Sequence, residues 1–369
     1  MISFCPIFAQ KKIWDHPIIQ KFTSSTKDST RSARLLILPV FSYAQETGFE
    51  FGLTGIYNFY VDKADSTIFT SNLNTVTTIT TEKQINLKLE SDIWTKGNEY
   101  HYIAAIRYKK YPFNFYGLGD QTRAADKILL TQKYIQLNLE VEKKLVKNYY
   151  AGINTRFENF DFEQGSPDED FNLNNLYGGF GGKYLAFGLS QSYDSRNSNT
   201  ETTKGLYGRM KYAYAPDFWK GDNYTGGIFD VDLRAFFPVY KQISIGIQGI
   251  FETLSSEKIP FYLTSQLGND EMMRGYYRGR YRDKNYLASQ SEIRYRPHPR
   301  IGFAAFIGAG TVYDNKLDLS NLKFSGGGGI RYFFDLEHNS SIRLDYAVGE
   351  KRREEKRQGG FYLALGQAF

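Results

Sequence analysis

The sequence is poor in the residues on which disulfide frameworks, helical membrane spans and metal clusters depend. Among 369 residues there is a single cysteine, Cys5, and there are four histidines. One cysteine excludes an internal disulfide and offers no metal cluster. No stretch approaches the roughly 20 consecutive apolar residues of a membrane helix, and the mean hydropathy is -0.47. These absences point away from helical membrane proteins and disulfide-rich domains.

Aromatic residues and glycine are abundant instead. The chain has 29 tyrosines, 29 phenylalanines and 34 glycines, and its formal net charge is +6. Low hydropathy with many aromatics suits a membrane β-barrel, in which every second strand residue faces a polar interior. Solvated loop and lumen residues explain the modest positive charge, and we favour that explanation over nucleic-acid binding.

Apolar and polar residues alternate with a period of two from Arg34 onward, most clearly in residues 85–93, 134–142 and 229–237. Such alternation indicates an extended chain with one apolar and one polar face. A soluble β-sandwich has the same period. The alternating segments run roughly 10–16 residues, whereas soluble strands are commonly about 5–6 and membrane strands need about 9–11. Segment length therefore favours a membrane barrel.

The pattern predicts an all-β fold, a 16-stranded antiparallel transmembrane β-barrel spanning residues 34–369. If both termini are periplasmic, the long connections at 112–129, 163–176, 255–284 and 350–358 all fall on the extracellular side. The main exception is 195–204, a longer link on the periplasmic side. The expected strands are 34–43, 48–61, 66–80, 83–95, 99–111, 130–145, 148–162, 177–194, 205–218, 223–240, 242–254, 285–297, 300–313, 322–335, 340–349 and 359–369.

Residues 1–33 are expected to precede the barrel without belonging to it. Residues 1–10 are short and apolar and resemble the tail of a secretory signal, although an ordinary flexible terminus would look the same. Residues 11–33 are polar and rich in serine and threonine, which predicts a disordered or periplasmic lead-in.

An enzyme is the competing functional class. The histidines are placed beside no candidate nucleophile, and catalytic arrangements need partners that converge in space. Glycine-rich stretches fall in expected strands rather than in phosphate-binding loops. We therefore expect no enzyme, no catalytic residue, no metal and no cofactor. The histidines are His16, His101, His298 and His338.

The connection at 255–284 is the most distinctive stretch because residues 273–285 crowd five cationic side chains and three tyrosines around two glycines. We predict that it folds back into the barrel lumen. An exposed basic loop touching lipopolysaccharide phosphates is the alternative. The charged run 351–357 fits that second description better, as solvated charges near anionic headgroups.

Arg274-Gly275-Tyr276, between the eleventh and twelfth expected strands, resembles the motif of the BamA/TamA superfamily of outer-membrane insertases and two-partner secretion transporters. The continuation GRYRDKN at 279–285 is similar to short members of the bacterial surface antigen type. Residues 193–196 and 310–314 also match, and the terminal Phe369 resembles the aromatic assembly signal of outer-membrane proteins. The resemblance covers residues 34–369.

The resemblance implies a lumen loop lock that holds the motif arginine. Strand parity turns Glu292 and Phe306 inward, so Glu292 would pair with Arg274 and Phe306 would stack on its guanidinium. The family tends to place an acidic residue where this chain has Gly308, so we expect Glu292 to carry more of the lock alone. Inward glycines would form a bay for Tyr276, or would serve barrel curvature. These glycines are Gly308, Gly310, Gly327 and Gly329.

The resemblance also implies a function in the bacterial outer membrane, in protein insertion or translocation. The expected surroundings are outer-membrane lipids and lipopolysaccharide, and client outer-membrane proteins are the expected substrates. Family insertases carry periplasmic POTRA domains, for which the expected lead-in is too short, so we expect a periplasmic or outer-membrane partner to supply the receptor role. A passive channel or a structural barrel subunit of another envelope complex is the alternative. No nucleic-acid partner is expected.

Overall fold

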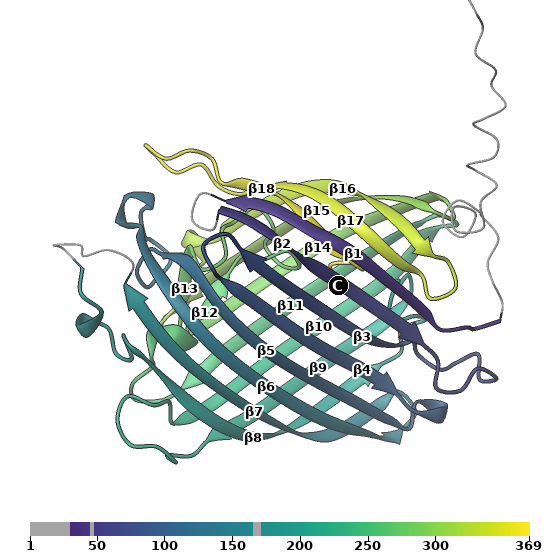
Figure 1. Ribbon diagram of the computed structural model, residues 1–369. Coiled ribbons are helices and arrows are strands. Elements are labelled where there is room, and N and C mark those ends of the chain that lie inside the picture. The colour runs from purple at the N-terminus through teal and green to yellow at the C-terminus, as the bar shows by residue number, and fades with distance from the viewer. Residues whose placement is uncertain (1–29, 45–47, 165–170) are drawn as a thin grey trace, which may run out of the picture.

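The computed structural model describes residues 30–44, 48–164 and 171–369. Sixteen strands form one antiparallel sheet in which each strand pairs with its neighbours in chain order (Figure 1). In order they are β1 (Arg34–Ala44), β2 (Gly48–Phe59), β3 (Ser71–Thr80), β4 (Ile85–Trp94), β5 (Tyr100–Phe115), β6 (Ile128–Val146), β7 (Tyr149–Gln164), β8 (Gly181–Asp194), β9 (Gly205–Ala215), β10 (Gly226–Tyr240), β11 (Ile243–Ser255), β14 (Asn285–His298), β15 (Ile301–Tyr313), β16 (Lys323–Asp335), β17 (Ser340–Val348) and β18 (Gly359–Leu365).

The predicted sixteen-stranded antiparallel sheet is confirmed. Four boundaries differ from the expected ones by four or five residues: the start of β3, the end of β5, the start of β8 and the end of β18. β3 begins at Ser71 rather than at residue 66, because Phe69 and Thr70 hydrogen-bond across connections, to Asn98 and Asn199. β5 continues through Pro112 to Phe115, paired with β6 throughout.

The connection between β11 and β14, residues 256–284, adds two short strands that sequence periodicity did not indicate. These are β12 (Ser265–Leu267) and β13 (Tyr281–Asp283), which pair with each other. The described residues also contain single 3-10 turns, and no helix among them is long and apolar enough to cross a membrane. The turns are η1 (Lys96–Asn98), η2 (Ala124–Asp126), η3 (Leu173–Asn175), η4 (Phe261–Leu263) and η5 (Leu319–Asn321).

The alternating pattern produces one apolar and one polar face, as β15 shows. Phe303 and Ile307 are exposed on the outer face, whereas Ala304 and Phe306 between them are buried inside. Large apolar side chains are exposed along nearly every strand, including Phe361 and Leu363 of β18 at 75% each. A continuous apolar surface of this kind marks contact with another apolar phase rather than with water.

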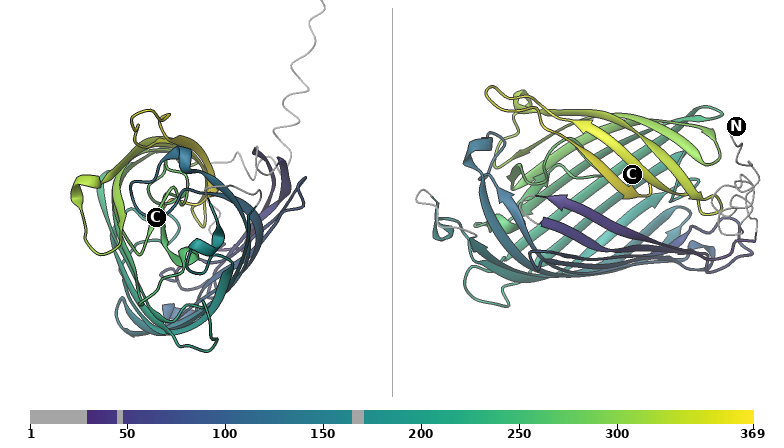
Figure 2. Two further views of the ribbon diagram at one scale, coloured as in Figure 1. Left: turned by 90° about the vertical axis from the view of Figure 1, so that its left-hand side faces the viewer. Right: turned by 45° about the horizontal axis from the view of Figure 1, so that its top comes forward.

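The sheet curls into a barrel whose first and last strands form its two edges (Figure 2). Within the described residues, no backbone ladder joins β1 to β18. At one end of the barrel, side chains bridge this gap between β1 and β16 and between β2 and β17. Arg34 lies 3.9 Å from Asp335, and buried Asn58 donates a 2.8 Å hydrogen bond to Ser340. The seam between β1 and β18 is therefore a discontinuity in an otherwise fully paired sheet.

The connections differ at the two ends of the barrel. Five long ones, 116–127, 165–180, 216–225, 256–284 and 349–358, share one end, here called the long-loop end. The opposite, short-turn end has tight turns such as 147–148, where Asn148 has a positive φ of 65°. Two longer connections, 60–70 and 195–204, are exceptions there, although the first was expected to be short. They contact each other because Asn199 exchanges hydrogen bonds with the backbone of Thr70.

The C-terminal residues do not continue the last strand. β18 was expected to reach residue 369 but ends at Leu365, and Gly366 has a positive φ of 78°. The chain then turns inward, and Figure 2 marks the C-terminus inside the ring of strands. Phe369 is 6% exposed and packs against Phe236 of β10.

Candidate functional site

The candidate site is built where the β11–β14 loop (residues 256–284) meets the inner face of the sheet. Figure 2 shows this segment inside the ring of strands when the barrel is viewed from the long-loop end. Arg274 of this segment is 1% exposed, although an arginine is almost never fully buried without partners. Its surroundings therefore determine what the loop does.

Three inward side chains surround the Arg274 guanidinium. Nη2 donates to Glu292 Oε2 at 2.8 Å, and Nη1 donates to Asp345 Oδ2 at 2.7 Å. The ring of Phe306 lies below the guanidinium plane, with its centroid 3.4 Å from Cζ. The structure thus brings Arg274, Glu292 and Phe306 together in the arrangement expected from strand parity.

The expectation that Glu292 carries most of the lock alone was wrong, because Asp345 of β17 is an equal partner. Both carboxylates are completely buried. A signal for Asp345 was present in the sequence, since β17 alternates apolar outer residues such as Leu344 with inward polar ones. Alternation alone does not show which inward residues of β17 the loop reaches.

Further arginines serve the same two carboxylates. Arg294 donates through Nε to Glu292 Oε1 at 2.8 Å. Arg331 contacts both carboxylates, and Arg343 reaches Asp345 Oδ2 at 3.2 Å. Together with Arg274, four arginines share two fully buried carboxylates. Arg343 also donates to Asp270 of the loop, with Nη2 to Oδ2 at 2.9 Å. Each carboxylate therefore keeps a cationic neighbour even without Arg274.

Gly275 allows the loop to touch the barrel wall. Its φ is +108°, and an added Cβ would lie 2.6 Å from the carbonyl carbon of Val348 and 2.9 Å from Gly349 N. Its N–H donates to the hydroxyl of Tyr362 in β18 at 2.7 Å. A residue with a side chain would be strained here and would also clash with backbone. Glycine at this position thus connects the loop directly to the last strand.

Tyr276 docks at a different place from the expected glycine bay. Its ring lies against Gly349, where an added Cβ would be 2.8 Å from Cζ. The Tyr276 hydroxyl donates to the Phe324 carbonyl at 2.7 Å and accepts from the N–H of Glu350 at 3.0 Å. Tyr276 therefore docks beside the β17–β18 connection. The alternation of residues along β16 did not indicate this position.

The four expected docking glycines make room for other groups. Gly308 faces the sulfur of buried Met273 from the loop, Gly327 faces the edge of the Phe306 ring, and Gly329 faces Asp345. Gly310 faces the neighbouring strand rather than the loop. The absence of side chains on β15 and β16 thus makes room for the lock residues and for the Met273 side chain.

Arg294 joins the lock to two further segments. Besides Glu292, it donates to the Phe369 carbonyl oxygen at 2.7 Å and to the Thr202 carbonyl at 3.2 Å. Its guanidinium lies 4.9 Å from the centroid of the Phe369 ring. The C-terminal tail and the 195–204 connection therefore meet at a side chain that also binds a lock carboxylate. Sequence patterns gave no sign of this contact.

The loops at the long-loop end support one another. Thr122 donates to the Arg280 carbonyl at 2.8 Å, and Arg352 donates to the Thr122 carbonyl at 2.7 Å. Glu355 accepts from Arg280 at 3.0 Å. The charged run 351–357, expected as solvated charge, is thus partly used to hold other loops, whereas the Arg353 side chain is 96% exposed.

Two of the described histidines contact acidic groups, whereas the ring of His298 accepts a 3.2 Å hydrogen bond from the N–H of Arg300. His101 lies between Asp92 and Glu142 at 3.1 and 3.2 Å, and His338 contacts Asp335 at 2.6 Å. Within the described part of the chain, no group of three or more His, Cys, Asp or Glu side chains is arranged to hold a metal ion. Cys5 and His16 lie outside the described residues.

A barrel of sixteen antiparallel strands with an arginine-bearing loop bound to its inner wall defines a class of outer-membrane barrel. The model of the Omp85 superfamily domain matches residues 51–369, so the chain belongs to the Omp85 superfamily. The resemblance noted in the sequence is thereby confirmed. Membership supports a barrel of the insertase and translocation type.

Solved structures show the same fold at low sequence identity. BamA from Haemophilus ducreyi lacking POTRA domains 1–3 has a TM-score of 0.57 and 12% identity, over 91% of this chain and 70% of that one. CdiB from Acinetobacter baumannii has a TM-score of 0.55 and 12% identity, over 92% of this chain and 66% of that one. CdiB from Escherichia coli has a TM-score of 0.56 and 10% identity, over 91% of this chain and 62% of that one. The search of curated proteins found no match.

Proposed function

We propose that this protein is an integral barrel of the bacterial outer membrane that inserts or translocates polypeptides through the seam between β1 and β18. The seam is the observation that carries the proposal. Every other pair of neighbouring strands is hydrogen-bonded, whereas β1 and β18 share no ladder within the described residues. Exposed strand edges present unpaired N–H and C=O groups, on which an incoming strand can form a sheet.

The loop lock supports this function by holding the wall on one side of the seam. The loop binds β14 through Glu292, β17 through Asp345 and β18 through Tyr362. These contacts fix the C-terminal strands to a rigid internal brace. The loop also binds β5, where the N–H of Asn114 donates to the Tyr277 hydroxyl at 3.0 Å. We infer that β1, the first strand of the sheet, is the side of the seam that moves.

A passive channel, the alternative, fits the structure less well because two segments cross the lumen. The β11–β14 loop fills much of the long-loop end (Figure 2). At the short-turn end, Thr200 of the 195–204 connection contacts the His338 carbonyl, while Asn199 holds Thr70. Unfolded client outer-membrane proteins are the proposed substrates. A periplasmic or outer-membrane partner is proposed to deliver them.

A covalent bridge across the seam tests the proposal. Ile37→Cys and Leu363→Cys, both on the exposed outer face, are joined by a short bismaleimide in a Cys5→Ser background. The matched control bridges Leu53→Cys to Thr77→Cys, which face each other in the β2–β3 ladder. The proteins are reconstituted in liposomes, and insertion of an unfolded outer-membrane protein is followed by protease protection.

We expect the seam bridge to stop insertion and the control bridge to leave it unchanged. Equal insertion by both bridged proteins would show that the seam does not open. Steady ionic current from the unbridged protein, with no client insertion even when periplasmic extract is added, would favour the passive channel.

A further inference from the structure

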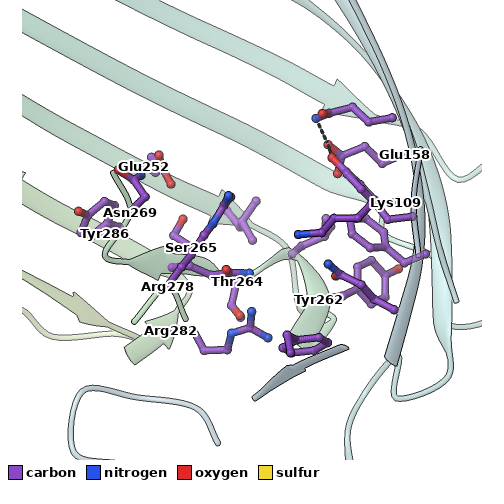
Figure 3. Close-up of a pocket in the computed structure, with 18 of the residues that line it drawn as sticks. Lys109, Glu158, Glu252, Tyr262, Thr264, Ser265, Asn269, Arg278, Arg282 and Tyr286 are labelled. Atoms are coloured by element: carbon purple, nitrogen blue, oxygen red, sulfur yellow. Dashed lines mark hydrogen bonds between the residues drawn. The ribbon is translucent and has the colours of Figure 1, made fainter. Parts of the chain in front are cut away.

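A cavity of about 490 Å³ lies in the lumen at the long-loop end, between the inner faces of β5–β8, β10 and β11 and one side of the β11–β14 loop. Figure 3 shows Lys109, Arg278 and Arg282 around the same space, which is separate from the lock at Arg274. Arg107 completes a group of four cations along the cavity wall. The mechanism proposed above uses none of them.

Arg282 is the most informative of these cations. It is 3% exposed, and its Nε and Nη1 atoms have no hydrogen-bond partner. The guanidinium is flanked by the rings of Phe113 and Phe115, whose centroids are 5.7 and 5.6 Å from Cζ. Burial, with the neighbouring charge of Arg278, lowers the pKa of Arg282 to about 10, so it stays protonated at neutral pH. Donors buried without partners are costly, so a ligand that supplies acceptor oxygens here would stabilise the site.

The backbone holds Arg282 in place. Arg282 pairs with Gln266 in the β12–β13 ladder, and its carbonyl accepts a 2.7 Å hydrogen bond from the N–H of Gly119 in another loop. The backbone that carries the side chain is therefore held by two loop contacts, and the side chain itself is buried. It is a preorganised donor rather than a flexible surface arginine.

The other three cations also lack acidic partners. Among the residues that the structure describes, no carboxylate lies within 4.0 Å of Arg107, Lys109, Arg278 or Arg282. The Arg107 guanidinium reaches only Asn86, at 3.5 Å, and Lys109 lies over the ring of Tyr111.

The carboxylates of the cavity wall do not compensate these charges. Glu158 is occupied by Arg156 at 2.7 Å and by Gln136 at 2.6 Å. Asp230 has Lys211 at 3.8 Å. Glu252 lies beside Asn269 and Tyr286, on the opposite side of the cavity from Lys109 (Figure 3). Five cations, including Arg156, thus face three carboxylates along the wall, which leaves two positive charges in excess.

We propose that this cavity is a binding site for a phosphate group, carried either by a small soluble phosphate ester or by a lipid headgroup at the barrel mouth. Guanidinium groups bind phosphate oxygens through paired N–H donors, and an ammonium group adds a point charge. The volume lies within the usual range for small-molecule sites, roughly 300–1,000 Å³. The tyrosine and phenylalanine rings that line the cavity offer flat surfaces to an attached sugar or base.

Calorimetric titration of the purified protein with inorganic pyrophosphate, at constant ionic strength in lipid-free detergent, tests the site. Lys109→Gln combined with Arg278→Gln removes two cations whose side chains are not fully buried. The control is Lys127→Gln, which removes an exposed charge on a neighbouring loop outside the cavity. Circular dichroism and thermal unfolding verify that each variant is folded.

We expect saturable binding by the unaltered protein and by the control, and affinity at least tenfold lower for the double variant. Arg282→Lys should retain more affinity than Arg282→Gln, because the charge remains. A second series, in nanodiscs, compares lipid A with dephosphorylated lipid A. If lipid A competes with pyrophosphate and dephosphorylated lipid A does not, the phosphate belongs to a lipid headgroup. If neither lipid competes, the phosphate belongs to a soluble ester. The proposal is overturned if pyrophosphate does not bind saturably, or if the double variant binds as tightly as the control.

Discussion

Removing Glu292 should destabilise the protein more than removing Arg274, although the two form one ion pair. Glu292 Oε1 accepts from Arg294 and Oε2 accepts from Arg274, each at 2.8 Å. In Glu292→Gln one of these oxygens becomes an NH2 group, which faces an arginine donor. Asp345 is then the only buried carboxylate left for the four lock arginines. Leaving a buried charge without its partner costs about 3–5 kcal/mol.

Arg274→Ala has a different consequence because no anion is left alone. Glu292 keeps Arg294 at 2.8 Å, and Asp345 keeps Arg343 at 3.2 Å. The loss is limited to hydrogen bonds with charged groups, worth about 1.5–3 kcal/mol, and to the contact with Phe306. We therefore expect a smaller loss of global stability, concentrated in the loop.

Two measurements separate these effects. Thermal unfolding in detergent reports the stability of the barrel, and limited proteolysis reports release of residues 256–284. Glu292→Gln should lower the unfolding temperature more, while both variants expose the loop. When the two substitutions are combined, Arg274→Ala should partly restore the unfolding temperature lost in Glu292→Gln, because it removes one uncompensated cation. If Arg274→Ala proves as destabilising as Glu292→Gln, or the two losses simply add, the shared-charge description is wrong.

Three further outcomes follow from the packing. Gly275→Ala should cost about 1–3 kcal/mol and make the loop accessible to proteolysis. The control Gly249→Ala, with no atom within 4 Å of the added Cβ, should leave proteolysis unchanged. Equal proteolysis of the two variants would refute the close approach of the loop to the wall at Gly275. Asn58→Ala should speed amide hydrogen exchange in β1 by removing a buried hydrogen bond worth about 1 kcal/mol; unchanged exchange would mean that this contact does not hold the seam. Gly246→Ala places a Cβ 2.8 Å from the Phe369 ring and should increase maleimide labelling of a cysteine placed at residue 368, and unchanged labelling would contradict the inward packing.

Arg294 suggests that the lock, the C-terminal tail and the short-turn end respond to one another. It contacts Glu292, Phe369 and the Thr202 carbonyl at once. Movement of any one of these segments changes the hydrogen bonds available to the others. We therefore expect variants of Arg294 to affect both loop proteolysis and tail accessibility, which separates it from residues that touch only one segment.

The sequence by itself determined the strand count and the two faces of the sheet, because alternation is a local property of each strand. The same parity turned Glu292 and Phe306 toward Arg274, and it depends only on the two strands that flank the 299–300 turn. The family motif located the loop. None of these conclusions required knowledge of which distant strands meet.

Only the tertiary structure decided the contacts that depend on how the sheet curls and where the loop lies. Asp345, Arg331 and Arg343 join the lock because β16 and β17 bend around the loop, and Tyr276 reaches Gly349 rather than the glycines of β16. The tail turns inward at Gly366 instead of extending β18, so Phe369 meets Phe236 and Arg294 across the lumen. At the short-turn end, side chains of β1 and β2 likewise meet side chains of β16 and β17. Such contacts join residues far apart in the chain, and their positions follow from closure of the whole sheet rather than from any local pattern.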